Sequence, residues 1–258
     1  MNNTIFITGA SSGVGREVSK VFLQNGWNVI ATARRLNLLK SIKINEKDKK
    51  SELRGRIIPL RLDVTNKNIL SKKISECIKK NGIPDIVFLN AGTNYANDKA
   101  ITSSENTKKL FEVNFFGVLN CIDIFMPYLK RKKKNTQLII MSSVAGYRGL
   151  PYSGAYCSSK AALINYAESI YNQSESHGIK VRVVNPGFIK TPLTDKNKFN
   201  MPLIISSEKA GKILYKKFLY TSKFEINLPN FFCIIMKLLR IIPYYIYFRL
   251  TKLTLRKL

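Results

Sequence analysis

The chain has few acidic residues, a single histidine and no cysteine spacing typical of a cross-link or a metal site. Its 258 residues include 43 Lys and Arg against 16 Asp and Glu, which gives a formal net charge of +27. His177 precedes Gly178 near a predicted helix end, where we expect a capping role rather than catalysis. The cysteine pattern excludes a disulfide framework, predicts no bound metal and favours a reducing compartment. The cysteines are Cys77, Cys121, Cys157 and Cys233.

The sequence also lacks a linker rich in Gly, Ser or Pro, and it shows no internal repeat. The length suits one hydrophobic core. We therefore expect one domain over residues 1–228, followed by a basic, apolar extension over residues 229–258. The first predicted strand begins within a few residues of Met1, so we expect no signal peptide and a cytoplasmic location.

Short apolar runs alternate with segments of helical character. This alternation predicts an α/β fold, a doubly wound parallel sheet with helices on both faces. Ligands of such sheets bind beyond the carboxyl ends of the strands, so residues that follow the strands are candidates for a site. The expected strands lie near residues 3–8, 27–33, 56–61, 84–90, 136–142 and 179–185.

A glycine-rich turn follows the first expected strand. The sequence from Thr8 to Gly15 is TGASSGVG, and it leads into an amphipathic helical pattern. Glycines permit a tight reversal and close approach of the backbone, while Ser11, Ser12 and the amides of a helix start favour a diphosphate. The turn predicts a phosphate-binding site. The alternative is a turn that only joins a strand to a helix.

Tyr156 and Lys160 are spaced so that, in a helix, their side chains project from one face one turn apart. A nearby cation favours the phenolate, so we expect Lys160 to lower the pKa of Tyr156, as general acid–base chemistry requires. Ser143 ends an apolar strand and offers a hydroxyl to the same substrate oxygen. Taken alone, the Tyr and Lys would more often be a surface pair.

Further motifs of one family follow these two in the expected order along the chain. The chain therefore resembles the short-chain dehydrogenase/reductases over roughly residues 3–195. The resemblance implies a Rossmann fold with a seventh strand near residues 224–228, a nicotinamide cofactor, a homodimer and hydride transfer between a carbonyl and an alcohol. The matching motifs are TGxxxGxG at 8–15, Asp63-Val64, Asn90-Ala91-Gly92, Asn114 in EVNFFG, Ser143, YxxxK at 156–160 and PGxxxT at 186–191.

The resemblance also implies roles for single residues. Ser143 would hold the carbonyl oxygen and Tyr156 would deliver the proton, while Lys160 would bind the nicotinamide ribose. Asn114 would anchor a water that refills the proton relay, although an amide that satisfies its own helix backbone is the alternative. Thr191 would meet the carboxamide. The implied catalytic residues are Asn114, Ser143, Tyr156 and Lys160. The implied cofactor-binding residues are Gly9, Ser11, Ser12, Gly13, Val14, Gly15, Arg34, Arg35, Asp63, Val64, Asn90, Ala91, Gly92, Tyr156, Lys160, Pro186, Gly187, Ile189 and Thr191.

The end of the second strand indicates which cofactor is used. Arg34 and Arg35 stand where enzymes that bind NAD place a carboxylate. Guanidinium groups suit a 2′-phosphate, so we expect NADP(H) to be favoured over NAD(H). The alternative is a pair of solvated arginines.

Two segments expected above the nicotinamide, residues 147–152 and 188–205, are mainly apolar. They predict a cleft for an apolar carbonyl or alcohol, or else a lid that only packs on the sheet. The candidate residues are Leu150, Tyr152, Phe188, Leu193, Phe199, Met201, Leu203, Ile204 and Ile205, with Lys190, Lys196 and Lys198 able to swing in.

The positive charge has no role in the predicted chemistry. Clusters at 130–134 and at Lys72, Lys73, Lys79 and Lys80 precede strands, so we expect them near the amino ends, away from the cofactor. No nucleic-acid-binding module accompanies them, and nucleic acid is an unlikely partner. A non-catalytic NADP-binding redox sensor and a basic scaffold for a membrane or RNA are the alternative functions; an intact Ser143, Tyr156 and Lys160 argue against the sensor.

The tail from Pro229 to Leu258 holds six Lys and Arg, no acidic residue and no apolar run of about 20 residues. Arg249, Lys252 and Arg256 recur at helical spacing, and aromatic residues surround Tyr244. The pattern predicts a helix pair broken at Pro243 that contacts an anionic membrane peripherally through residues 230–258. An arm packed on the protein itself or on a neighbouring subunit is the alternative.

Overall fold

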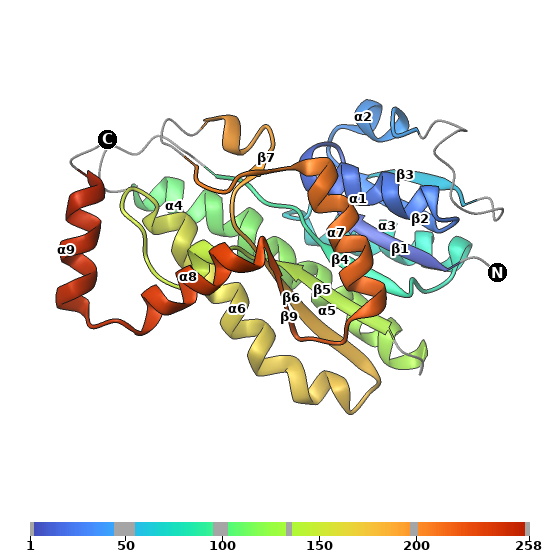
Figure 1. The fold of residues 1–258 in the computed structure, drawn as a ribbon. Coiled ribbons are helices and arrows are strands. Elements are labelled where there is room, and N and C mark those ends of the chain that lie inside the picture. The colour runs from blue at the N-terminus through green and yellow to red at the C-terminus, as the bar shows by residue number, and fades with distance from the viewer. Residues whose placement is uncertain (1–2, 44–54, 95–102, 133–135, 197–200, 256–258) are drawn as a thin grey trace.

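The computed structural model describes residues 3–43, 55–94, 103–132, 136–196 and 201–255 (Figure 1). Its centre is a seven-stranded, wholly parallel sheet in the order β3-β2-β1-β4-β5-β6-β9. All seven expected strands are present. Their bounds are β1 Thr4–Thr8, β2 Asn28–Ala33, β3 Ile57–Arg61, β4 Ile86–Leu89, β5 Thr136–Met141, β6 Ile179–Pro186 and β9 Glu225–Leu228.

Helices cover both faces of the sheet, as the alternating pattern predicts. Along β1, Ile5 and Ile7 pack against α1 and α7, while Phe6 packs into the opposite core with Phe125, because successive strand residues point to opposite faces. The elements on the first face are α1 Gly13–Gln24, α2 Leu36–Lys40 and α7 Ser207–Tyr220. Those on the second are α3 Lys67–Asn81, α4 Ser104–Phe111, α5 Gly117–Lys132 and α6 Gly154–Glu175.

Three short features were not expected from the sequence. A π-helical turn, Glu112–Phe116, joins α4 to α5, and a small second sheet pairs β7 Ile189–Lys190 with β8 Ile205–Ser206. Short 3₁₀ turns occupy Val144–Gly146 and Thr194–Lys196. π-Helical turns are often found at functional sites.

After β9, the expected helix pair is present as α8 Asn230–Ile241 and α9 Tyr244–Leu255, with the break at Pro243.

One helical run in the described part of the chain, Ser104–Lys132, is long and apolar enough to cross a membrane by length and composition. Several of its apolar side chains instead belong to the core. Phe125 is fully buried, and Leu129 is 1% exposed. The run is therefore a core helix of the α/β fold, interrupted by the π-helical turn.

The placement of the basic clusters agrees only in part with expectation. Lys132 pairs with Asp85 at 2.7 Å, just before β4, so the end of α5 lies near the amino ends of the strands as predicted. Lys73 instead donates to the carbonyl of Arg61 at the carboxyl end of β3. The prediction was wrong for this lysine, because α3 starts at that edge of the sheet and only later reaches the other. Residues 133–134 lie outside the described residues.

The single histidine and the four cysteines lie in environments that agree with the sequence prediction. The Nδ1 atom of His177 lies 3.0 Å from the carbonyl oxygen of Gln173 in the last turn of α6, which confirms the capping role. All four cysteines are free and buried. Cys157, the neighbour of Tyr156, only accepts a hydrogen bond from the Leu150 amide through its sulfur.

Candidate active site

The carboxyl ends of the central strands open onto a cleft of about 470 Å³. Its volume falls in the range of small-molecule sites. Residues from every predicted motif meet there, although they are far apart in the sequence. The predicted residues on its wall are Gly9, Ser11, Ser12, Gly13, Val14, Arg34, Arg35, Asp63, Val64, Asn90, Ala91, Gly92, Ser143, Tyr156, Lys160, Pro186, Gly187, Ile189, Thr191 and Leu193.

The glycine-rich turn is held against the loop after β4. Thr8 Oγ1 accepts hydrogen bonds from the amides of Asn90 and Ala91, each at 2.9 Å. Gly9 has a φ of +68°, and a Cβ there would lie 2.8 Å from Ala91 Cα, so only glycine fits. Gly15 was expected to bind cofactor but does not line the cleft. Its position is constrained by packing, because a Cβ there would lie 2.6 Å from Asn90 Nδ2.

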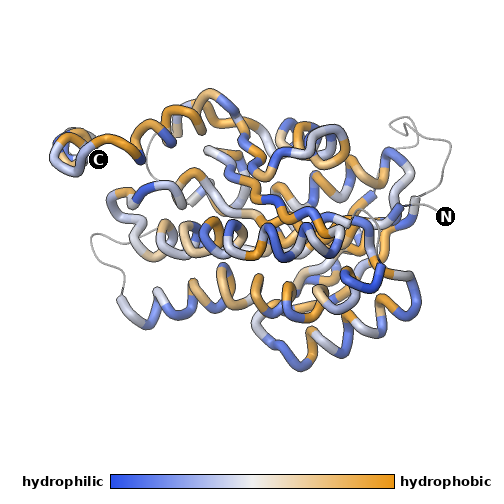
Figure 2. The backbone as a smooth tube through the Cα atoms, turned by 90° about the horizontal axis from the view of Figure 1, so that it is seen from below, coloured by the Kyte–Doolittle hydropathy of each residue, from blue (hydrophilic) through white to orange (hydrophobic). Residues whose placement is uncertain are grey.

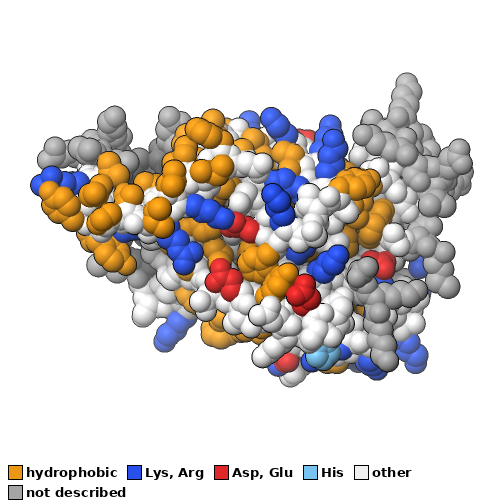
Figure 3. Space-filling view, turned by 60° about the horizontal axis from the view of Figure 1, so that its bottom comes forward, with side chains coloured by type: hydrophobic (Ala, Val, Ile, Leu, Met, Phe, Trp, Pro, Cys, Tyr) orange, Lys and Arg blue, Asp and Glu red, His pale blue; other side chains and the backbone are white. Residues whose placement is uncertain are grey.

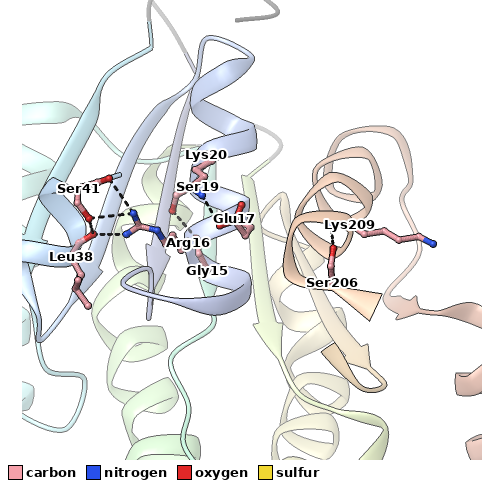
Figure 4. A network of polar contacts seen from close by, with 9 residues as sticks. All are labelled: Gly15, Arg16, Glu17, Ser19, Lys20, Leu38, Ser41, Ser206 and Lys209. Atoms are coloured by element: carbon pink, nitrogen blue, oxygen red, sulfur yellow. Dashed lines mark hydrogen bonds and ion pairs between the residues drawn. The ribbon is translucent and has the colours of Figure 1, made fainter. Parts of the chain in front are cut away.

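Two arginines make hydrogen bonds around the glycine-rich turn and the helix that follows it. Arg35 donates to Ser11 Oγ at 3.0 Å and Ser12 Oγ at 3.2 Å, which brings its guanidinium over the glycine-rich turn. Arg16 was not singled out from the sequence. It donates to the carbonyl of Leu38 at 2.7 Å and so holds α2 next to α1 (Figure 4). Its position directly after Gly15 is the signal that could have identified it.

Ser143, Tyr156 and Lys160 come together at the end of β5 and the start of α6. The Ser143 hydroxyl accepts from the Ala145 amide at 3.1 Å and donates to the Pro186 carbonyl at 3.4 Å. Lys160 is buried, and its Nζ donates to the Met141 carbonyl at 3.0 Å. The same Nζ lies 5.7 Å from the centroid of the Tyr156 ring. The expected arrangement on one helix face is therefore present.

The expected direction of the Tyr156 pKa shift was wrong. Burial raises the pKa of Tyr156 to about 12, and the hydrogen bond with Ser143 opposes this shift only in part. Burial also lowers the pKa of Lys160 to about 8. Desolvation thus sets the direction of both pKa shifts. The sequence shows the spacing of the pair but not the depth at which it lies.

Asn114 lies behind the cleft, in the π-helical turn, and is fully buried. Its Oδ1 accepts from the Thr93 amide at 2.7 Å, while its Nδ2 donates to the Thr93 carbonyl at 2.9 Å and to Ser159 Oγ at 3.2 Å. The alternative, an amide bonded to its own helix, was wrong. Asn114 instead joins the loop after β4 to α6. A Cβ on Gly92 would lie 3.4 Å from Asn114 Oδ1 and 3.6 Å from Lys160 Nζ.

The two segments expected above the nicotinamide contribute only in part to the cleft wall. Leu193 lines the cleft, and Leu203 and Ile204 are exposed. Tyr147 points away, because its hydroxyl donates to the Glu225 carboxylate at 2.5 Å beneath α8. Burial and this carboxylate raise the Tyr147 pKa. Residues 197–200, including Lys198 and Phe199, lie outside the described residues.

Further cleft residues were missed in the sequence. They lie within three positions of the motif residues, and their only signal is that position. They are Thr32, Ala33, Leu62, Thr93, Val113, Met141, Ser142, Pro192 and Thr194.

Comparison with known proteins assigns the family. A family model described as short chain dehydrogenase matches residues 3–201, which is most of the chain. The protein therefore belongs to the short-chain dehydrogenase/reductase family. It is an oxidoreductase that depends on a nicotinamide cofactor.

Several relatives are similar over most of the chain. An uncharacterized oxidoreductase of Myxococcus xanthus is 28% identical over 240 residues, which cover 93% of this chain and 92% of the relative. A 3-ketodihydrosphingosine reductase of Bacteroides thetaiotaomicron is 32% identical, over 76% of this chain and 67% of the relative. A 3-oxoacyl-(acyl-carrier-protein) reductase of Thermotoga maritima is also 32% identical, over 74% and 75%.

Solved structures share the fold. A short chain dehydrogenase of Burkholderia cenocepacia in complex with NADP has a TM-score of 0.79 at 22% identity, over 96% of this chain and 97% of that one. A short chain dehydrogenase/reductase of Burkholderia phymatum in complex with NAD has a TM-score of 0.78 at 18% identity, over 92% of each chain. Both cofactors thus occur among proteins of this fold.

Proposed function

We propose that the protein is an NADP(H)-dependent oxidoreductase that interconverts a carbonyl and an alcohol on an apolar substrate. The observation that carries the proposal is the convergence of Ser143, Tyr156 and Lys160 on one cleft that also holds the glycine-rich turn and Arg35. A panel of aliphatic, steroid-like and acyl ketones, followed by oxidation of NADPH, tests it. No turnover with any member would count against an enzyme and favour a non-catalytic redox sensor.

The cleft fits a dinucleotide. Ser12 is the N-cap of α1 but its side chain makes no capping hydrogen bond, and Ser12, Gly13 and Val14 line the cleft at the start of this helix. Amides at a helix start favour phosphate groups. The opposite wall is near, because a Cβ on Gly13 would lie 3.1 Å from Thr191 Cγ2. When bound, the nicotinamide supplies or accepts the hydride.

Each side chain of the site would have its own role in the reaction. Ser143 would orient the carbonyl oxygen through its hydroxyl, and Tyr156, whose raised pKa keeps it protonated at neutral pH, would donate the proton as alkoxide charge develops. Lys160 would hold the ribose hydroxyls and stabilise the tyrosinate that remains. Asn114 would keep the loop at Thr93 and α6 at Ser159 in fixed relation, which positions Lys160.

The pH dependence should follow Lys160. We expect kcat/KM for reduction to fall as the pH rises through about 8, because Lys160 loses its charge there while Tyr156, with a pKa of about 12, keeps its proton. Since kcat/KM reports groups of the free enzyme, a profile measured well below and well above pH 8 checks this. A flat profile across this range would contradict a titrating Lys160.

The preference for NADP(H) rests on Arg34 and Arg35. Both line the cleft after β2, and Arg35 already lies at the glycine-rich turn. We expect the double variant Arg34→Ala/Arg35→Ala to weaken NADPH binding by roughly 10- to 100-fold through the loss of charged hydrogen bonds, with NADH binding almost unchanged. Titration of both cofactors measures the change. Equal affinity of the wild-type protein for NADH and NADPH would overturn the preference.

The substrate class is inferred from the cleft and from relatives. Leu193 and Val113 add apolar surface to the cleft wall. Two relatives are named as reductases of a 3-ketodihydrosphingosine and of a 3-oxoacyl group on an acyl carrier protein. We infer a ketone or aldehyde attached to an apolar chain, with the physiological direction set by the cofactor ratio.

We also propose a homodimer formed through α5 and α6, the helices that follow the turn of Asn114 and carry Tyr156. Their outer sides form a hollow of about 320 Å³ lined partly by Ile122, Met126, Tyr166 and Ile170. Sedimentation velocity of the purified protein tests this.

For location we propose the cytoplasm, with attachment to a membrane surface through residues 230–258.

A further inference from the structure

Helices α8 and α9 present a large apolar surface to solvent. One side of α8 is buried through Cys233 and Met236, and the opposite side is exposed. Figure 2 shows a largely hydrophobic stretch of backbone at this end of the molecule, and Figure 3 shows hydrophobic side chains gathered on its surface there. We call this set the outer face. Its residues, each 38–77% exposed, are Phe231, Ile234, Ile235, Leu238, Ile241, Tyr244, Tyr245, Ile246, Phe248 and Leu250.

The outer face is held firmly to the protein. Arg148 donates to the carbonyls of Arg240 at 3.0 Å and Ile242 at 2.8 Å, at the end of α8. Its guanidinium also lies over the ring of Tyr247, 4.0 Å from the centroid. The Tyr247 hydroxyl donates to the Gly149 carbonyl, and Lys237 pairs with Glu225 of β9. The apolar residues are therefore exposed by a defined packing arrangement, although soluble monomers rarely expose so large a patch.

The positive charge around the outer face indicates what kind of partner binds there. The segment from Pro229 to Leu258 contains no acidic residue, and the exposed Lys237, Arg240, Arg249 and Lys252 flank the apolar side chains. A symmetric contact between two copies would place these like charges together, which disfavours it. An anionic lipid surface instead attracts them, while aromatic residues such as Tyr244 and Tyr245 suit the headgroup boundary.

We propose that the outer face is the surface by which the protein docks on an anionic lipid bilayer. The helices would lie in the plane of the interface, with apolar side chains among the acyl chains and basic groups at the headgroups. The contact is peripheral, because α8 and α9 have 12 residues each, too few to span a bilayer.

Docking would place the bilayer beside the cleft. The ring of Phe232 on α8 packs 5.6 Å from that of Phe188. A Cβ on Gly187, which lines the cleft, would lie 2.5 Å from Phe232. The start of α8 thus forms the back of one cleft wall. An apolar carbonyl substrate could reach the site from the lipid, a consequence that rests on the proposed function.

Sedimentation with vesicles tests the docking surface without any measurement of turnover. We expect the full-length protein to bind phosphatidylcholine vesicles that contain phosphatidylglycerol, and to bind weakly when phosphatidylglycerol is absent. Ile234→Ser/Leu238→Ser should lower the partition coefficient on the order of 100-fold, since two apolar side chains are withdrawn from lipid. Arg249→Gln/Lys252→Gln should lower it roughly 20-fold at low salt.

Matched variants elsewhere on the surface provide the controls. Ile69 and Tyr220 are 50% and 75% exposed and lie outside α8 and α9, so Ile69→Ser/Tyr220→Ser should bind vesicles like the wild type. Lys72→Gln/Lys79→Gln should likewise leave binding unchanged. Equal losses in the control and outer-face variants, or no loss in the latter, would overturn the proposal. A decrease in oligomer size caused by Ile234→Ser/Leu238→Ser would identify a second copy as the occupant and also overturn it.

Discussion

Turnover of a carbonyl substrate with NADPH is expected to fall by about 10³- to 10⁴-fold in Tyr156→Phe. The substitution removes one oxygen atom and leaves the aromatic ring at the start of α6, where Lys160 Nζ lies 5.7 Å from the ring centroid. The Ser143 hydroxyl would still orient the carbonyl oxygen in this variant, but the proposed proton donor would be missing. The loss should appear in kcat, while fluorescence titration should show nearly unchanged NADPH binding.

Tyr171→Phe provides the matched control for this experiment. Tyr171 lies on the same helix, and its hydroxyl lies 3.4 Å from Glu175 Oε1, near the distant end of α6. Its loss should leave turnover within about twofold of the wild type, as expected for a surface substitution. Substantial turnover in Tyr156→Phe would remove the phenol from the proposed mechanism, whatever the control shows.

Arg182→Met is expected to lower the free energy of unfolding by about 3 kcal/mol. Arg182, on β6, is only 1% exposed. Its guanidinium donates to the carbonyls of Lys217 at 3.0 Å and Lys223 at 2.9 Å, and to Gln137 Oε1 at 2.9 Å. Methionine preserves much of the packing volume but leaves the part-buried Lys223 carbonyl and Gln137 Oε1 without the Arg182 donor. The Lys217 carbonyl keeps Thr221 Oγ1 as a donor.

Urea denaturation measures this change through the midpoint of unfolding. Lys180→Met is the control, since Lys180 is an exposed residue of the same strand and its replacement should change the free energy of unfolding by less than about 0.5 kcal/mol. Arg182 lies at the amino half of β6, away from the cleft, so activity per folded molecule should be retained. Equal stability of the two variants would show that other donors, such as water, satisfy the carbonyls.

The motifs predicted the fold well because their physical causes are local. Alternating apolar runs led to six strands, the family resemblance led to the seventh, and the sequence around Pro243 led to a broken helix pair. The π-helical turn at Asn114 and the small β7–β8 sheet were missed, since each depends on contacts with distant segments. Asn114 shows this directly: its partners, Thr93 and Ser159, are far from it in the sequence.

The sequence by itself determined the family, the order of the strands along the chain and the set of residues at their carboxyl ends. It did so because glycine turns, helical spacing and strand periodicity act over a few neighbouring residues. Only the tertiary structure decided that burial raises the Tyr156 pKa, that Tyr147 points away from the cleft, and which side of α8 faces solvent. Desolvation and exposure depend on everything packed around a side chain, and that environment is assembled from the whole chain.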